Sequence, residues 1–281
     1  MRLEWICADD SQIQVTEILP SLKHAAAGAE TSHSRASDLL FRLRIARRRM
    51  RRGIADFFEG LSRCEKMHDG PYSLVVAESR SKLWSDERPA EAVFQKGKIH
   101  NLRMAAQELD DVLLLPGEIF SFWKQVGRAT RERGYVVGRM LQQGCLVPAV
   151  GGGLCQLSNA LYDAALQSGC EIVERHAHSR VVPGSAAAAG RDATVAWNYV
   201  DLRFRSRVPL LIRARLTQEE LAVSFCAFPG TVVPRERPQQ GRERAMMPSD
   251  VAHGKEPTPE MVATCATCEH AECFRHEREE S

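Results

Sequence analysis

Residues 151–166 read GGGLCQLSNALYDAAL, in which three glycines and a leucine precede Cys155 and a helical pattern follows. The pattern predicts a helix from Cys155 to Ser168, and Gly169 supplies the glycine that is common just past a helix end. The N–H groups and the dipole at a helix start favour an anion, so a thiolate at Cys155 would be stabilised. Cys155 therefore has two interpretations, a small buried side chain behind a flexible turn or a nucleophile at a helix start.

The composition is that of an ordinary soluble globular protein. The 281 residues are 44% hydrophobic and 26% charged, which allows one or two domains with a substantial core. The formal net charge of +2 offers no electrostatic argument for nucleic acid, so no specific nucleic-acid partner is expected.

The N-terminus does not read as a signal peptide, because Asp9 and Asp10 interrupt it, and no apolar run of about 18 residues occurs. We therefore expect a cytoplasmic protein, at most peripheral to a membrane. Nine cysteines in such a compartment favour free thiols, metal ligands or catalysis over a disulfide framework.

The chain divides into four expected parts. These are a helical N-terminal region at 1–94, a main domain at 95–229, a polar linker at 230–260 and a short Cys/His tail at 261–281. The main domain is expected to be α+β, with the cysteine-bearing helix packed on a mixed or antiparallel sheet.

The end of the main domain predicts an antiparallel meander. Three strands are expected, at 193–205, 209–216 and 221–228, with connections short enough for hairpins. Val200, Leu202 and Phe204 alternate with polar residues, so they should form the buried face of the first strand. A helix is also expected earlier, at 99–109.

A basic amphipathic helix is predicted from Ser37 to Leu61. Its apolar positions recur at helical intervals: Leu39, Leu43, Ala46, Met50, Ile54, Phe57, Phe58 and Leu61. Its other face holds Arg42, Arg44, Arg47, Arg48, Arg49, Arg51 and Arg52. We interpret the arginines as a solvated helix face, and the alternative is contact with an anionic membrane surface or nucleic acid.

A thiolate nucleophile needs a base, and the base needs an orienting group. His176 and His178 occupy alternate positions of ERHAHS (174–179), so on a strand they would share one face, and Asp192 opens the next strand. The candidate catalytic set is Cys155 as nucleophile, His178 or else His176 as base, and Asp192 as orienting group.

Further polar groups surround this set. Backbone N–H groups near the glycines, together with Gln156, would hold an oxyanion. Glu174 and Arg175 are expected on the exposed face of their strand.

Three interpretations of this set stay open. The first is a cysteine-dependent hydrolase or acyltransferase that acts on an amide. The second is a non-catalytic binding or accessory module, in which the glycine turn and the ERHAHS loop form a pocket. The third is a metal site made of Cys155, His176 and His178.

Taken together, the motifs in residues 95–228 resemble the VanW family, named after an accessory protein of some vancomycin-resistance clusters. The matching stretches are NLRMAA, PGEIFSF, GGGLCQLS, ERHAHS and GRDATV. The resemblance implies a link to glycopeptide resistance or cell-envelope metabolism. The expected substrate is an unidentified small molecule or peptide, and no organic cofactor is expected. It marks as candidate substrate-binding residues Asn101, Arg103, Glu118, Gly151, Gly152, Gly153, Ser158, Arg175 and Ser179.

The tail has the spacing C-x2-C-x4-C-x2-H, formed by Cys265, Cys268, Cys273 and His276. Four such ligands within twelve residues can close a tetrahedral site around Zn²⁺, and His270 competes as a ligand. An iron–sulfur cluster is the alternative cofactor, and a tail with adventitious thiols is the alternative without metal.

Overall fold

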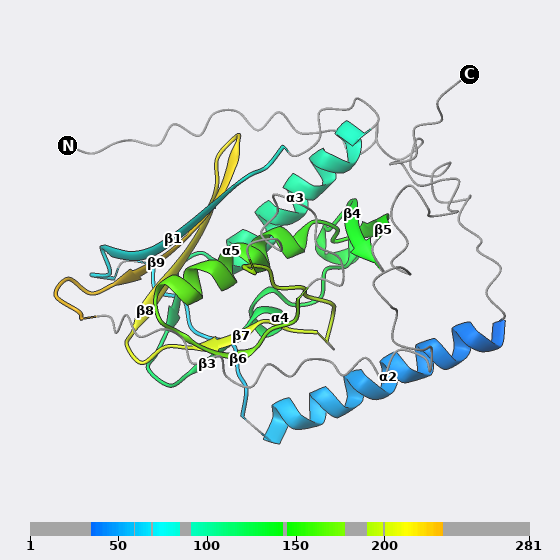
Figure 1. Cartoon of the computed structure of the whole chain (residues 1–281), viewed down its shortest axis with the longest axis horizontal. Coiled ribbons are helices and arrows are strands. Elements are labelled where there is room, and N and C mark those ends of the chain that lie inside the picture. Colours follow the sequence, from blue (N-terminus) through cyan, green and yellow to red (C-terminus); the bar gives the residue numbers. More distant parts are fainter. Residues whose placement is uncertain are drawn as a thin grey trace.

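A computed structural model of the chain describes residues 35–58, 60–68, 70–84, 91–142, 145–177, 190–198 and 200–232 (Figure 1). The polar linker, the Cys/His tail, His178 and Ser179 lie outside these residues. The described part is α+β with one main domain, as the sequence predicts, and one hydrophobic cluster joins most of its buried apolar side chains.

The largest sheet has the strand order β1-β9-β8-β2, and every pairing is antiparallel. Its strands are β1 (Leu74–Lys82), β2 (Val112–Leu114), β8 (Leu210–Leu216) and β9 (Glu220–Ala227). Strands β8 and β9 form the predicted hairpin, in which Leu216 pairs with Leu221 and Ala214 with Val223. The alternation along β9 buries Leu221, Val223 and Phe225, because successive side chains of a strand point to opposite faces.

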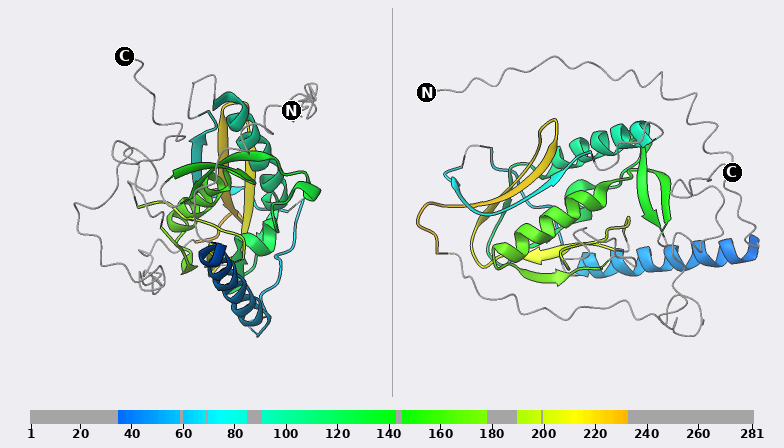
Figure 2. Two further views of the ribbon diagram at one scale, coloured as in Figure 1. Left: turned by 90° about the vertical axis from the view of Figure 1, so that its right-hand side faces the viewer. Right: turned by 45° about the horizontal axis from the view of Figure 1, so that its top comes forward.

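Helices α3 (Ala92–Leu109) and α5 (Leu154–Gln167) pack on this sheet and on each other (Figures 1 and 2). The sequence predicts both helices, although α3 starts before residue 99. Helix α5 buries Leu157, Leu161 and Ala164, which recur at helical spacing. Gly169 follows its end with a φ of 67°, a left-handed conformation that glycine adopts without strain.

A second sheet of order β3-β7-β6 corrects the predicted meander. It consists of β3 (Ile119–Ser121), β6 (Glu171–Glu174) and β7 (Arg203–Arg205), and the short α4 (Phe122–Val126) follows β3. Strand β7 does not continue into a hairpin with β8, because both of its edges are already paired. Arg205 lies opposite Ile119 on one side and opposite Glu171 on the other.

A two-stranded ribbon stands before α5. It is made of β4 (Val137–Gln142) and β5 (Cys145–Val150), with a 3-10 turn at Arg131–Arg133 before it. Residues 151–153 then turn the chain from β5 into α5.

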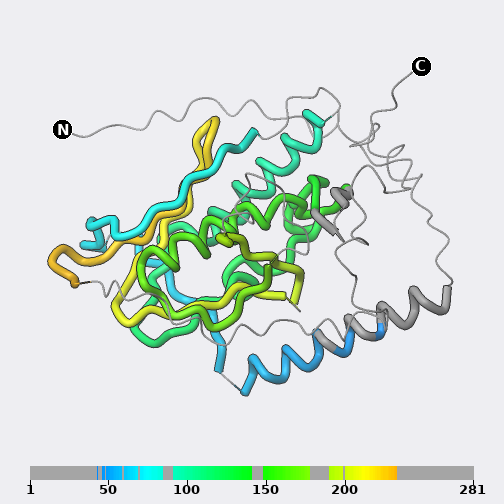
Figure 3. Tube along the Cα trace, viewed as in Figure 1, coloured from blue at the N-terminus to red at the C-terminus, as the bar shows by residue number. Residues whose placement is uncertain are grey.

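The N-terminal region, expected to be helical, also contributes a strand to the largest sheet. Strand β1 lies side by side with β9, which follows it by more than a hundred residues in sequence (Figure 3). Helix α2 (Arg35–Phe58) lies at the outside of the domain, near β6 and β7 (Figures 1 and 2). No helix among the described residues is long and apolar enough to cross a bilayer.

Candidate functional site

Cys155 lies in the first turn of α5, and the glycines before it are required by backbone geometry. Gly153 has a φ of 102°, and a Cβ there would lie 2.3 Å from Cγ of Lys98. A Cβ on Gly152 would lie 2.4 Å from the carbonyl carbon of Gly138. The turn therefore packs so closely on β4 and α3 that no larger side chain fits.

Asn101 holds this turn in place through hydrogen bonds to the backbone. Its side-chain N–H groups donate to the carbonyl oxygens of Val136 (2.9 Å) and Gly152 (3.0 Å), and its Oδ1 accepts the Val136 N–H (2.9 Å). Asn101 is fully buried, and burying an amide is favourable only when its hydrogen bonds are made. The candidate residue Asn101 thus positions the backbone that leads to Cys155.

The Cys155 thiol differs from the other described thiols in its access to solvent. Cys155 is partly exposed, whereas Cys64, Cys170 and Cys226 are buried. Burial raises the pKa of Cys64 to about 12, with a further contribution from Glu118, and raises the pKa of Cys170 to about 11. Burial also raises the pKa of Cys226. Among the described cysteines, Cys155 is therefore the one that is not buried, although it also packs against the hydrophobic core.

Lys98 brings a second titratable group to the start of α5. Its Cβ, Cγ and Cδ lie against Gly153, the N-cap residue, which offers no side-chain hydrogen bond to the first turn. Lys98 is only 9% exposed, and burial lowers its pKa to about 8. The sequence reasoning missed this residue, although a lysine three residues before Asn101 on the inner face of a helix was a usable signal.

Gln156 and Glu118, two further candidate site residues, form hydrogen bonds within the protein. Gln156 Nε2 donates to Ser81 Oγ (2.9 Å) and to the Lys82 carbonyl (2.8 Å), so it ties α5 to β1. Glu118 Oε2 accepts the Leu115 N–H (3.0 Å) across the Pro-Gly turn. Arg103 is exposed on α3.

Arg175 and Asp192 meet, and both are buried or half-buried. Arg175 donates from Nη2 to Asp192 Oδ1 (2.7 Å) and from Nε to the Asp192 carbonyl (2.7 Å). Its guanidinium lies 5.1 Å from the ring centre of Tyr162 on α5. The prediction of an exposed Arg175 was therefore wrong, because the chain after β6 folds back onto α5.

The segment around Asp192 is also bonded to α5 and to the chain after β6. Ser158 Oγ donates to the Ala193 carbonyl (2.5 Å), and the Ala193 N–H donates to Asn159 Oδ1 (2.7 Å). The Thr194 N–H donates to the His176 carbonyl (2.7 Å). The structure thus brings the GGGLCQLS, ERHAHS and GRDATV motifs together around α5.

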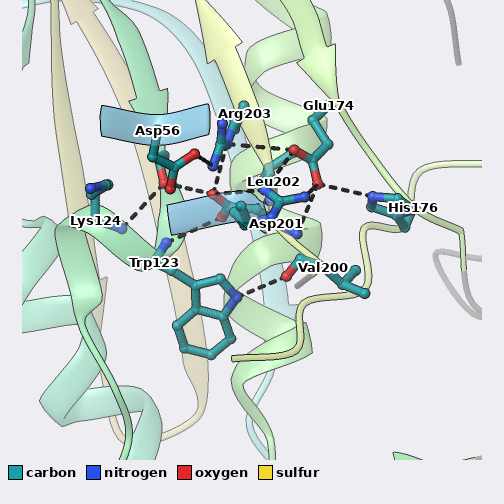
Figure 4. Close-up of polar contacts among 11 residues, drawn as sticks. Asp56, Trp123, Lys124, Glu174, His176, Val200, Asp201, Leu202 and Arg203 are labelled. Carbon is teal, nitrogen blue, oxygen red and sulfur yellow. Dashed lines mark hydrogen bonds and ion pairs between the residues drawn. The ribbon is translucent and has the colours of Figure 1, made fainter. Parts of the chain in front are cut away.

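A buried charge cluster, which sequence reasoning missed, lies beside this region (Figure 4). We call it the Glu174 cluster, and its members are Arg52, Asp56, Ser121, Glu174, His176, Asp201 and Arg203. Arg203 donates to Asp56 Oδ1 (2.6 Å) and to Asp201 Oδ2 (2.9 Å). Arg52 forms a two-bonded pair with Glu174 at 2.8 and 2.6 Å.

Asp201 and Arg203 correct the predicted alternation. Val200, Leu202 and Phe204 are buried as expected, but Asp201 and Arg203 on the other face are also buried, at 1% and 6% exposed. Helix α2 and the start of α4 cover that face. Asp201 accepts hydrogen bonds from Ser121 Oγ (2.6 Å) and from the Trp123 N–H (3.2 Å).

Glu174 and Asp201, two acids of the cluster, have pKa values shifted in opposite directions. Burial alone would raise the pKa of Glu174, but hydrogen bonds from His176 and Arg52 and nearby arginine charge lower it to about 2. Burial raises the pKa of Asp201 despite the charge of Arg203. Glu174 was expected on an exposed face, and this expectation was wrong because Arg52 and His176 cover its carboxylate.

The placement of the candidate histidines is described for His176 alone. Its Nε2 lies 3.0 Å from Glu174 Oε1, so the ring faces the Glu174 cluster. The described residues include no group of three His, Cys, Asp or Glu side chains that could hold a metal ion. The base assignment to His178 stays a prediction.

Residues 97–226 match the family model described as VanW like protein. These residues, a little under half of the chain, form a VanW-like domain. Over 122 residues, the chain is 41% identical to Uncharacterized protein YoaR of Bacillus subtilis (strain 168), covering 43% of this chain and 40% of that protein. Over 154 residues, it is 31% identical to Vancomycin B-type resistance protein VanW of Enterococcus faecalis (strain ATCC 700802 / V583), covering 53% of this chain and 55% of that protein.

The matches thus span about half the length of each relative, and no solved structure matches the chain. The VanW segment contains Cys155, Lys98, the Arg175–Asp192 pair and most of the Glu174 cluster. Arg52 and Asp56 lie before it, so the cluster joins the VanW domain to α2.

Proposed function

We propose that this protein with a VanW-like domain is a cysteine-dependent hydrolase or acyltransferase acting on an amide in cell-envelope metabolism linked to glycopeptide resistance. The observation that carries the proposal is the position of Cys155. It is a partly exposed thiol in the first turn of α5, while the other described thiols are buried and held protonated. The printed name of the Enterococcus relative supports the link to resistance.

In the proposed reaction, the Cys155 thiolate attacks the amide carbonyl carbon and forms a C–S bond. The carbonyl oxygen becomes an oxyanion, which the N–H groups at the start of α5 would stabilise. When the C–N bond breaks, the base returns the thiol proton to the leaving amine. Water then hydrolyses the thioester, or an acceptor amine takes the acyl group.

His178 and Lys98 are the two candidate bases. His176 is less suited, because its Nε2 already lies against Glu174. Lys98 lies against Gly153 and, with a pKa of about 8, would be partly neutral near neutral pH. Asp192 is paired with Arg175, three residues before His178 in sequence, and would act as the orienting group.

The test is the rate at which iodoacetamide alkylates Cys155 in the full chain, followed by peptide mass spectrometry. We expect Cys155 to react at neutral pH faster than free cysteine, and Cys64, Cys170 and Cys226 to stay unmodified until the protein unfolds. His178→Ala or Lys98→Gln should slow the reaction several-fold, and Lys96→Gln, at an exposed position of the same helix as Lys98, is the matched control. A Cys155 that reacts no faster than free cysteine, or equally fast in all variants, would contradict the proposal.

The alternative function is a binding or accessory module without a covalent step. The side chains of Asn101, Gln156 and Ser158 form hydrogen bonds with the protein's own backbone and side chains. This structural role of three candidate site residues favours the alternative. This alternative predicts that Cys155→Ser retains the function of the protein in a host cell challenged with a glycopeptide. The hydrolase or acyltransferase predicts that the same variant loses that function.

We also propose, from the sequence alone, that the C-terminal motif binds Zn²⁺ as a structural site. Metal analysis of the full chain should find about one zinc per chain. Cys265→Ser with Cys268→Ser should release it. Visible absorption with bound iron would show an iron–sulfur cluster instead.

A further inference from the structure

The side of helix α2 that faces the domain carries the charged residues Arg49, Arg52 and Asp56. Arg49 donates from Nε to the Trp197 carbonyl (3.2 Å), Arg52 pairs with Glu174, and Asp56 pairs with Arg203. Residues 49, 52 and 56 are three and four apart, so they share one face of the helix. Among the α2 side chains that the structure describes, Asp56 is the buried one.

The large apolar side chains of α2 that the structure describes point away from the domain. Leu43, Met50, Ile54 and Phe57 also share one helix face by their spacing, and they are 56%, 62%, 51% and 80% exposed. Phe58 beside them is 82% exposed. An ordinary surface helix does the reverse, burying its apolar stripe and exposing its charges. We call this exposed stripe the outer face of α2.

Positive charge accompanies the outer face. Arg47 and Arg51 are exposed, and by spacing they lie on or beside the stripe of Leu43, Met50 and Ile54. The helix as a whole contains eight arginines and two aspartates. Aromatic and aliphatic side chains interleaved with arginine suit the boundary between lipid headgroups and acyl chains.

We propose that the outer face of α2 docks the protein onto an anionic lipid surface. Leu43, Met50, Ile54 and Phe57 would enter the headgroup boundary, and Arg47 and Arg51 would pair with lipid phosphates. The charge pattern argues against a second copy of this chain, because a two-fold contact would bring like arginine-bearing faces together. The inference does not depend on Cys155 or on the proposed reaction.

The attachment of α2 makes this docking rigid. Its inner face is fixed to the VanW domain by the Arg52–Glu174 and Asp56–Arg203 pairs, so the lipid surface would lie on the far side of α2 from the sheets. Figure 2 shows α2 along the outer side of the described domain.

The test is flotation of the full chain with vesicles of equimolar phosphatidylcholine and phosphatidylglycerol, compared with vesicles of phosphatidylcholine alone. We expect binding to the anionic vesicles and weak binding to the neutral ones. Ile54→Gln with Phe57→Gln should weaken binding by about a hundredfold, since each large apolar side chain contributes roughly tenfold. Arg47→Gln with Arg51→Gln should weaken binding to anionic vesicles by about tenfold or more and should reduce its salt dependence.

Phe228→Gln is the matched control, since Phe228 is 52% exposed just after the end of β9, outside α2, and should not affect binding. Circular dichroism should show that Ile54→Gln with Phe57→Gln stays folded. Vesicle binding that is absent in the wild type, or unchanged in that variant, overturns the proposal. So does a wild-type dimer in analytical ultracentrifugation that this variant converts to a monomer without any vesicle binding.

Discussion

Helices α5 and α2 are attached to the same domain by opposite chemistry. Helix α5 buries an apolar stripe that includes Leu157, Leu161 and Ala164 in the core. Helix α2 contributes no side chain to the core cluster within the described residues, and it is attached through Arg49, Arg52 and Asp56. The same periodicity of apolar residues therefore has two outcomes, and periodicity alone does not tell which face of a helix meets the protein.

The difference has an energetic consequence. Apolar burial is additive and tolerant of small changes, whereas a buried charge depends on a specific partner. The Glu174 cluster places the carboxyl groups of Asp56, Glu174 and Asp201 against the guanidinium groups of Arg52 and Arg203. Losing one partner leaves the others uncompensated, and the sharpest tests of the comparison follow from this.

Removing the central arginine should have the largest effect. Arg203→Met removes the ion-pair partner of Asp56 and leaves Asp201 with the more distant Arg52, at 3.9 Å, so the free energy of unfolding should fall by about 3–5 kcal/mol. Urea unfolding measures it. The matched control is Arg205→Met on the same strand, because Arg205 pairs with Glu171 in solvent and its loss should cost about 1 kcal/mol or less. Equal losses in the two variants would mean that α2 is not attached through the cluster.

The sequence was a good guide where local pattern decides the structure. The periodicity of residues 154–167 and the alternation at 210–227 gave α5 and the β8–β9 hairpin, because both are local and bury one face. Strand β1 was missed, since its pairing with β9 joins residues far apart in sequence. The place of β7 was missed for the same reason, as its partners β3 and β6 come from earlier parts of the chain.

The sequence predicted which residues belong to the candidate site better than it predicted which of them contact one another. Ser158, Arg175 and Asp192 were identified and do lie around α5, but the Arg175–Asp192 pair was not foreseen. Asp201 and Arg203 looked like the solvent face of a strand, because the sequence does not show that α2 covers it. Buried charges of this kind are hard to read from sequence, since they are ordinary surface residues until the partner is known.

Truncating a buried apolar side chain of α5 tests the attachment of this helix by apolar burial. Leu161 is fully buried, so Leu161→Ala should lower the free energy of unfolding by about 2–5 kcal/mol through lost burial and a residual cavity. The loss should be nearly independent of salt and of pH, unlike that of Arg203→Met. Urea titrations at low and high salt measure both properties, and a strong salt dependence for Leu161→Ala would break the contrast.

Acid should weaken the attachment of α2 through Glu174. The pKa of Glu174 is lowered from 4.5 to about 2, so its stabilising contribution is complete above pH 4.5 and is lost as the pH falls toward 2. The difference in unfolding free energy between wild type and Glu174→Gln should therefore shrink by up to about 3 kcal/mol over that interval. Glu171→Gln, in an exposed pair, should show much less pH dependence. If the difference in unfolding free energy between the two proteins stayed constant down to pH 2, the Glu174 carboxylate would not stabilise the fold through its ion pairs.

The smallest effect is expected on the outer face of α2. Ile54 is 51% exposed and meets no core cluster, so Ile54→Ala should change the free energy of unfolding by no more than about 0.5 kcal/mol. Leu161→Ala removes a side chain of the same size, so the ratio of the two losses measures how far the two helices differ. A loss near 2 kcal/mol for Ile54→Ala would mean that another part of the chain covers the outer face. The face would then belong to the fold and would not be available to a lipid surface.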